Sequence, residues 1–162
     1  MTTKNHTAFI AQSGIIAAMY IVLTFVAQPI SFGAVQVRIS EALCVLPVFT
    51  MSALPGLAVG CFLANLLSGA TMADVLFGSL ATLLGTVGTY ILRERRPYHL
   101  LPPIICNAII VPLVLIYAYG TAIAYPLLVI SIAAGEIVGV GVLGSMLQVM
   151  IERHGLLTRL IR

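Results

Sequence analysis

Residues 8–27 read AFIAQSGIIAAMYIVLTFVA, a run of twenty residues without a charged side chain. A run of this length can cross the hydrocarbon core of a membrane as an α-helix. The whole chain has the same character, because 60% of its 162 residues are hydrophobic and only 8% are charged. Soluble domains carry about 25% charged residues, and disordered chains combine low hydrophobicity with high charge, so both classes are excluded. We therefore predict an all-α membrane protein with a single transmembrane domain over residues 1–162.

Proline, glycine and charged residues divide the chain into about six predicted helices. The apolar region from Ala42 to Leu67 contains Pro47 and the Pro55-Gly56 pair, which interrupt a helix, so we predict two short helices there. An alternative with five helices fuses residues 42–67 into one span. Before this region, apolar and polar residues alternate over Val35–Ser40, which indicates an extended loop. The six predicted helices cover residues 8–28, 41–53, 56–67, 72–92, 100–119 and 125–151.

The basic residues indicate how the helices cross the membrane, because cytoplasmic loops carry an excess of Lys and Arg. With six helices and a cytoplasmic N-terminus, seven of the eight basic residues are cytoplasmic and only Arg38 is outside. The five-helix alternative has the opposite N-terminal orientation and only Lys4 as an exception, so charge does not decide between them. The Pro55-Gly56 break favours six helices. We predict a multi-pass protein of the cytoplasmic membrane with both termini in the cytoplasm.

A few polar residues lie inside or at the ends of the predicted spans, where ionisable groups are costly. In the six-helix arrangement they gather in the outer half, away from the basic cytoplasmic side, which indicates a ligand pocket open to the outside. The predicted site residues are Arg38, Glu41, Asn65, Asp74, Asn107 and Glu136. Alternatively, Glu41 and Asp74 stabilise helix N-termini, and the two asparagines form interhelical hydrogen bonds. Glu136 lies near the middle of its span, where a carboxylate is functional by default.

The charge of this predicted pocket indicates its ligand. Three carboxylates face one arginine, so a cationic or donor-rich ligand fits better than an anion. Carboxylate and amide side chains can pair with the adjacent N–H donors of a guanine-like base. Aromatic rings could stack on such a base, although packing and anchoring at the membrane interface are the commoner roles. The candidates for stacking are Phe32, Phe77, Tyr117 and Tyr119.

Several functions are disfavoured by the residues that the chain lacks. Cys44, Cys61 and Cys106 lie in apolar runs without metal-ligand spacing, and we predict no metal site and no cofactor. The three histidines lie outside or at the ends of the spans, so no intramembrane nucleophile–base pair is apparent and we predict that the chain is not an enzyme. The eight basic residues are too dispersed for a nucleic-acid site. A nucleotide-binding motif is absent too, so energy for transport would come from another protein.

Motifs within residues 36–92 resemble the QueT family. They are Val37-Arg38-Ile39-Ser40-Glu41-Ala42-Leu43, Leu54-Pro55-Gly56-Leu57, Gly60-Cys61, Leu63-Ala64-Asn65-Leu66-Leu67 and Asp74-Val75-Leu76-Phe77-Gly78-Ser79-Leu80-Ala81-Thr82-Leu83. QueT proteins are substrate-binding S-components of energy-coupling factor (ECF) transporters, assigned to queuosine precursors. The resemblance implies a six-transmembrane-helix bundle of the ECF S-component type, whose first outer loop covers the ligand. The implied ligand is preQ1, a deazaguanine base with an aminomethyl group, or its nitrile precursor preQ0, and the cationic preQ1 suits the predicted pocket better.

The resemblance also implies partner proteins. These are a transmembrane coupling protein, EcfT, and two EcfA-type ATPases, which would use the ATP. In transporters of this type, small residues four apart on the first helix contact the coupling protein, and Gly14 and Ala18 occupy that position here, with Gly in place of the more usual Ala. Two other functions remain open: an S-component for a different vitamin or purine-like nutrient, and a self-sufficient small membrane transporter or channel with a carboxylate-lined ion path.

Overall fold

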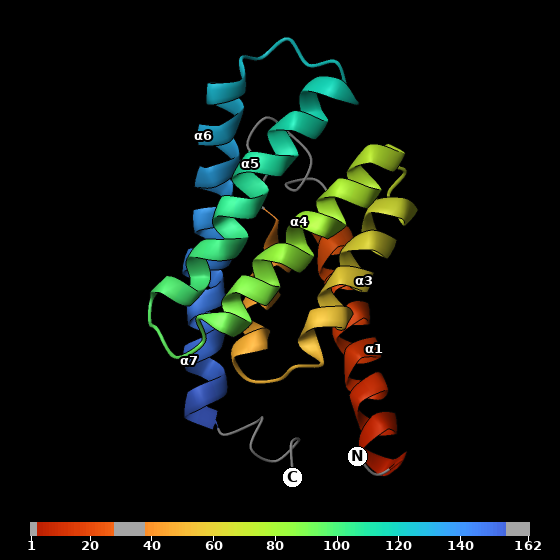
Figure 1. The fold of residues 1–162 in the computed structure, drawn as a ribbon, viewed down its shortest axis with the longest axis vertical. Coiled ribbons are helices and arrows are strands. Elements are labelled where there is room, and N and C mark those ends of the chain that lie inside the picture. The colour runs from red at the N-terminus through yellow and green to blue at the C-terminus, as the bar shows by residue number, and fades with distance from the viewer. Residues whose placement is uncertain (1–2, 28–37, 155–162) are drawn as a thin grey trace.

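The computed structural model describes residues 3–27 and 38–154, and in those ranges it contains helices and turns but no strand. Figure 1 shows long helices that form a bundle around a short central one. Of the elements below, η1 and η2 are 3₁₀ helices and η3 is a π-helix. In chain order they are α1 (Thr3–Val26), η1 (Ile39–Val48), α3 (Ala53–Leu67), α4 (Met72–Ile91), η2 (Tyr98–Leu100), α5 (Leu101–Tyr117), α6 (Tyr125–Glu136), η3 (Ile137–Gly144) and α7 (Ser145–His154).

The helices have the lengths expected of a multi-pass membrane protein. Four are long and apolar enough to cross a membrane, and the last of these runs without a break through α6, η3 and α7. They are His6–Val26, Met72–Ile91, Tyr98–Tyr117 and Tyr125–His154, while Ile39–Val48 and Ala53–Leu67 are shorter apolar helices. The all-α class and the count of six helical segments are thus confirmed for the described residues. Of the predicted extended loop at Val35–Ser40, residues 35–37 lie outside the described residues and Arg38 is extended. Ile39 and Ser40 already belong to the 3₁₀ helix η1, so the loop prediction is wrong for these two residues.

The chain breaks between η1 and α3 at residues 49–52, earlier than the predicted break at Pro55-Gly56. The segment expected as a helix over 41–53 is a 3₁₀ helix from Ile39 to Val48, and α3 begins at Ala53. Pro47 lies inside η1, where an α-helix would bring its ring against the carbonyl of Leu43. Pro55 lies in the first turn of α3, where the missing N–H removes no helical hydrogen bond. A single helix over residues 42–67 is therefore excluded.

The polar residues that interrupt the first apolar run hold this break in place. The Ser13 hydroxyl donates to the carbonyl oxygen of Ser52 at 2.9 Å, and the Ser52 hydroxyl donates to Gln12 Oε1 at 3.1 Å. Within the turn, the hydroxyl oxygens of Thr50 and Ser52 are 2.8 Å apart. These hydrogen bonds satisfy polar groups that would otherwise face an apolar surrounding, so α1 and the turn before α3 are tied together.

The short helix η1 forms the centre of the bundle. Its residues 40–47 are buried, and it packs against α1, α3, α4, η3 and α7. Leu43 and Leu46 belong to an apolar cluster shared with α1, α3 and α7, whereas Cys44 and Val45 pack toward Leu100 and Val140. On the η3 side, a Cβ atom at Gly139 would lie 2.8 Å from the Arg38 carbonyl oxygen, and one at Gly144 would lie 3.3 Å from that of Ala42. The core therefore surrounds η1 on several sides.

Glycines allow the long helices to pack closely. A Cβ atom at Gly60 of α3 would lie 2.8 Å from Tyr20 Cβ and 3.1 Å from the Ala17 backbone on α1. A Cβ atom at Gly85 of α4 would lie 2.6 Å from Pro103 Cα on α5. Contacts this short leave no room for a side chain, so small residues at these positions set the distance between the helices.

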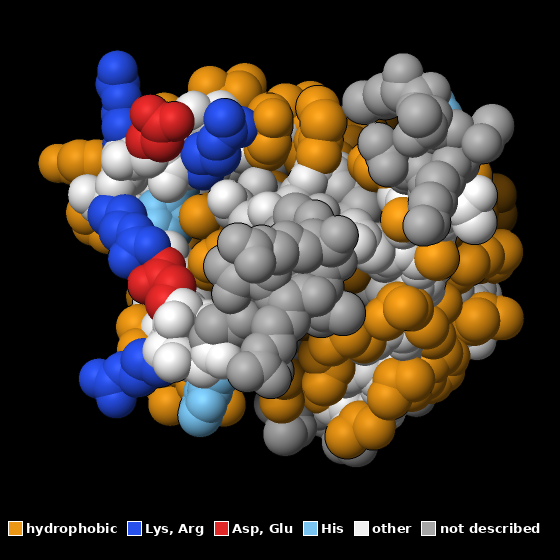
Figure 2. All heavy atoms as spheres, turned by 90° about the horizontal axis from the view of Figure 1, so that it is seen from below, with side chains coloured by type: hydrophobic (Ala, Val, Ile, Leu, Met, Phe, Trp, Pro, Cys, Tyr) orange, Lys and Arg blue, Asp and Glu red, His pale blue; other side chains and the backbone are white. Residues whose placement is uncertain are grey.

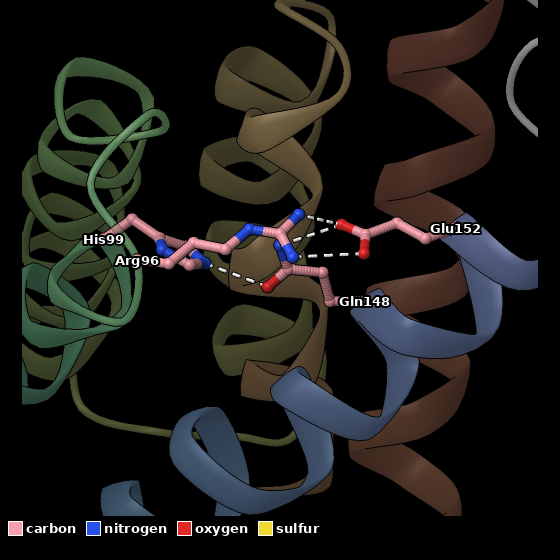
Figure 3. Close-up of polar contacts among 4 residues, drawn as sticks. All are labelled: Arg96, His99, Gln148 and Glu152. Atoms are coloured by element: carbon pink, nitrogen blue, oxygen red, sulfur yellow. Dashed lines mark hydrogen bonds and ion pairs between the residues drawn. The ribbon is translucent and has the colours of Figure 1, made fainter.

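Charged side chains gather at one end of the bundle. Figure 1 shows that α1 begins, α7 ends and the α4–α5 connection turns at this end, and Figure 2 views it directly. Arg96 forms a bidentate ion pair with Glu152, and the Gln148 amide donates to Glu152 Oε1 at 3.1 Å (Figure 3). His99 Nε2 lies 2.9 Å from Gln148 Oε1. This chain of contacts joins the α4–α5 connection to α7. The exposed or half-exposed charged residues of this end are Arg93, Glu94, Arg95, Arg96, Glu152 and Arg153.

The close contact at Gly60 predicts that adding a single methyl group at this position lowers the stability of the protein. Replacing Gly60 by Ala forces α1 away from α3, and we expect a loss of about 1–3 kcal/mol of stability. The matched control is Gly14→Ala on α1, where no atom lies within 4 Å of the added Cβ. That change should be neutral or stabilising by about 0.5–1 kcal/mol, since Ala favours helix over Gly. Thermal unfolding in detergent measures both variants, and equal melting temperatures would contradict the packing.

Candidate functional site

The six polar residues predicted from the sequence are all buried, and the structure brings them together. Each has an exposed fraction of 6% or less. Arg38 interacts electrostatically with Glu41 and Asp74, and Glu136 interacts with Arg38, Glu41 and Asn107. The Asn65 amide donates to the backbone oxygen of Asp74 at 3.4 Å. We call this group the polar cluster: Arg38, Glu41, Asn65, Asp74, Asn107 and Glu136.

Glu41 lies in the first turn of η1 and is fully buried. Its Oε1 atom accepts a hydrogen bond from the Tyr20 hydroxyl of α1, and the Thr82 hydroxyl of α4 is 3.5 Å from the same oxygen. Its Oε2 atom accepts from Cys44 Sγ at 2.9 Å. The carboxylate therefore has donors from three helices, as a buried charge requires.

Asp74 lies in the first turn of α4, but its carboxylate does not cap that helix. The Thr71 hydroxyl accepts from the Asp74 backbone N–H at 3.3 Å and serves as the N-cap. Tyr119 bridges the two residues, because its hydroxyl accepts from the Thr71 backbone N–H and donates to Asp74 Oδ2, both at 3.2 Å. The other carboxylate oxygen, Oδ1, is buried without a hydrogen-bond partner in the described part of the chain.

Asn107 and Glu136 provide further unpartnered polar atoms. They come from the middle of α5 and the end of α6, and they lie next to each other without reaching hydrogen-bonding geometry. Both amide atoms of Asn107, Glu136 Oε2 and Arg38 Nη2 are buried, and the described residues offer them no hydrogen-bond partner. Buried polar atoms are nearly always satisfied in proteins, so these atoms indicate a place for water or a ligand.

Gly78 of α4 keeps space beside the polar cluster. A Cβ atom at Gly78 would lie 3.0 Å from Asn65 Nδ2 and 3.2 Å from Asp74 Oδ1. A larger residue there would therefore displace polar groups that the cluster depends on. Among the described residues, no three His, Cys, Asp or Glu side chains are arranged to hold a metal ion. The unpartnered atoms of the cluster include the acceptor oxygens of Asp74, Asn107 and Glu136 and donor nitrogens of Arg38 and Asn107.

The aromatic residues proposed for stacking are not gathered at the cluster. Tyr117 is 84% exposed, and Phe77 is half exposed and lines apolar surface grooves beside α3 and α5. Tyr119 reaches the cluster through its hydroxyl, as described above. Phe32 lies outside the described residues. Stacking by Phe77 or Tyr117 would therefore need a ligand on the exposed surface, whereas the carboxylates of the cluster are buried.

Tyr20 and Thr82 also contribute hydroxyl groups to the cluster, although neither was predicted from the sequence as a site residue. Tyr20 is 1% exposed although it lies in the middle of the first apolar run. A hydroxyl group so deep in a span needs a partner, and that requirement was a usable signal. Thr82 gives no such signal, because a threonine in a membrane helix usually donates a hydrogen bond to the backbone of its own helix. The Thr82 hydroxyl also makes this contact, since it donates to the Gly78 carbonyl oxygen at 3.2 Å.

The two residues predicted for the partner interface lie on the surface. Gly14 and Ala18 are exposed, and no atom lies within 4 Å of a Cβ built at Gly14. The neighbouring glycine pair behaves differently, since Gly56 and Gly60 pack against α1 within the chain. Gly14 and Ala18 are therefore available for contact with another molecule.

Comparisons with known proteins agree with a transport role. A family model described as QueT transporter matches residues 10–153. The chain is also similar to the queuosine precursor transporter QueT of Lactococcus lactis subsp. cremoris (strain MG1363), with 37% identity over 82 residues. This alignment covers 49% of the chain and 48% of that protein, so the chain spans about half the length of the curated relative it matches. No solved structure matches the chain.

The family match extends over nearly all of the helical bundle, from the first turns of α1 to the last turn of α7. It includes every member of the polar cluster and the exposed pair Gly14 and Ala18. A family of transporters also excludes an enzyme, in agreement with the sequence prediction. The chain belongs to the QueT transporter family.

Proposed function

We propose that this chain is the high-affinity substrate-binding subunit of an ECF-type importer for a queuosine precursor, preQ1 or preQ0. The main support is the polar cluster, because Asp74, Asn107 and Glu136 carry buried polar atoms that lack partners within the described residues. The name of the Lactococcus relative, a queuosine precursor transporter, supports the choice of ligand. The fold would be the six-helix bundle of ECF S-components.

The chemistry of the ligand suits the cluster. A deazaguanine base presents adjacent N–H donors, which pair well with a carboxylate, and its carbonyl oxygen can accept from an amide or a guanidinium group. The three buried carboxylates outnumber the one buried arginine, which favours a ligand with a positive charge. The aminomethyl group of preQ1 is such a cation, whereas preQ0 carries a neutral nitrile. We therefore propose preQ1 as the preferred ligand, bound at the site that Arg38, Glu41, Asn65, Asp74, Asn107 and Glu136 form together.

The energy for uptake would come from partner proteins. The sequence lacks a nucleotide-binding motif, so we propose that two EcfA-type ATPases use the ATP and that the coupling protein EcfT joins them to this chain. Gly14 and Ala18 give α1 an exposed face of small residues, which suits close contact with a helix of EcfT. The charged end of the bundle would face the cytoplasm, together with both termini, because basic residues predominate there.

Ligand binding tests the proposal directly. Purified protein in detergent, titrated with preQ1 in a calorimeter, should bind it, and preQ0 should bind at least about tenfold more weakly because it lacks the ammonium charge. Guanine and thiamine serve as competitors. Binding of thiamine in place of preQ1 would instead identify an S-component for another nutrient, and a lack of preQ1 binding would contradict the ligand assignment.

The carboxylates of Asp74 and Glu136 should each contribute to preQ1 affinity. Asp74→Asn and Glu136→Gln each remove a charged acceptor, so we expect preQ1 affinity to fall about 10–100-fold in each variant. Glu94→Gln is the matched control, because Glu94 is exposed at the charged end of the bundle. Its affinity should equal that of the wild type. If all three variants bind alike, the buried carboxylates have a structural role only.

The coupling proposal predicts that binding and uptake can be separated. Gly14→Leu adds a bulky side chain to the exposed face of α1, so uptake of labelled preQ1 into vesicles that contain EcfT and both ATPases should be lost. Binding of preQ1 to the isolated variant should be unchanged, because no other element of the described residues comes within 4 Å of a Cβ at this position. Uptake into vesicles that contain this chain alone would show a self-sufficient transporter and contradict the proposal.

A further inference from the structure

Glu41 differs from the other acidic members of the polar cluster, because the protein itself satisfies both of its oxygens. The Tyr20 hydroxyl donates to Oε1, and Cys44 Sγ donates to Oε2 at 2.9 Å. Asp74 Oδ1 and Glu136 Oε2 have no such donor within residues 3–27 and 38–154. A carboxylate already supplied with donors gains little from a ligand, whereas an unsupplied one gains a charge-assisted hydrogen bond.

Tyr20 is placed to hold the first turn of η1. It is buried, and its Cβ lies against the backbone of α3 at Gly60, where no larger residue fits. One turn further along α1, the Thr24 hydroxyl is 2.9 Å from the Ser40 hydroxyl. Two hydroxyl groups on one face of α1 therefore bind the consecutive residues Ser40 and Glu41.

The first turn of η1 in turn sets the position of other members of the cluster. The backbone N–H of Glu41 donates to the Arg38 carbonyl oxygen at 3.1 Å. That same oxygen packs against Gly139, three residues beyond Glu136 in the continuous last helix. Arg38 and Glu136 therefore belong to two backbone segments that contact each other at the first turn of η1. Glu41 is anchored at the same turn.

We propose that Tyr20 is a positioning residue of the binding site. Its hydroxyl anchors Glu41, and this anchor fixes the first turn of η1, which holds Arg38 in place beside Glu136. Glu41 then acts within the protein, and the ligand is contacted by the cluster members that have unpartnered atoms, namely Arg38, Asp74, Asn107 and Glu136. This inference rests on the proposed binding function and assigns a division of labour within the same site.

A double-mutant cycle with preQ1 as the probe tests the role of Tyr20. Tyr20→Phe keeps the ring but removes the donor, so we expect affinity to fall about tenfold. If Tyr20 acts through Glu41, the double variant Tyr20→Phe/Glu41→Leu binds no more weakly than Glu41→Leu alone, because leucine offers the Tyr20 hydroxyl no acceptor. The control is Tyr125→Phe, because the Tyr125 hydroxyl donates to the Ile109 carbonyl oxygen at an exposed site. Its affinity should match that of the wild type.

Two results of the cycle overturn the inference while leaving the proposed function intact. One is wild-type affinity for preQ1 in Tyr20→Phe, and the other is a double variant whose loss is the product of the two single losses. The ratio of preQ1 affinity to preQ0 affinity should be the same in Glu41→Gln and in the wild type if Glu41 acts inside the protein. A direct contact would instead change that ratio, because the two ligands differ in charge.

Hydrogen–deuterium exchange of the ligand-free protein gives a test that does not depend on the ligand. Tyr20→Phe should speed exchange at the backbone amides of residues 41–44, because their first turn loses its anchor. Tyr125→Phe should leave that exchange unchanged. If Tyr20→Phe also leaves it unchanged, Tyr20 does not position η1, whichever ligand the protein binds. Failure of the wild type to bind preQ1 would by itself count only against the proposed function.

Discussion

The burial of the Glu41 carboxylate at the centre of the bundle is the constraint on which the other contacts depend. A carboxylate that leaves water without hydrogen-bond donors costs several kcal/mol or more. Its donors Tyr20 and Cys44 come from α1 and η1, and the Thr82 hydroxyl of α4 lies nearby. These elements must therefore keep their relative positions, and the glycine at position 60 lets α1 come close enough to supply the tyrosine.

The charges of the chain divide into two groups with different surroundings. The acidic residues Glu41, Asp74 and Glu136 are buried with Arg38, whereas Glu94 and Glu152 lie among the basic residues at one end. The first group lies in a low-dielectric setting, where each unpaired atom is costly and can bind a ligand strongly. The second group is solvated, and its ion pairs contribute little to stability. The buried charged residues at the centre are thus suited to binding a ligand, whereas the charged residues at the end of the bundle are solvated.

Much of the fold and of the site could be predicted from the sequence, because the membrane makes polar residues conspicuous. The six members of the polar cluster stood out as polar residues in apolar runs, and they do lie together. The 3₁₀ form of η1 could not be predicted, since it depends on burial from several sides around Pro47. Phe77 and Tyr117 looked like candidates for stacking because a sequence does not show which face of α4 or α5 is exposed. Tyr20 is not among the residues predicted for the site, although a hydroxyl group in the middle of an apolar run requires a partner.

The π-helix η3 changes how the last helix should be compared with related sequences. Gly139 and Gly144 both pack against backbone atoms of the chain around η1, although they are five residues apart. Five residues of an α-helix turn through about 500°, which would point the two glycines about 140° away from each other. The wider π turn restores them to one face. A helical wheel with α-helical periodicity would therefore place Gly144 on a face away from η1, and an alignment that omits one residue of η3 would rotate everything after it.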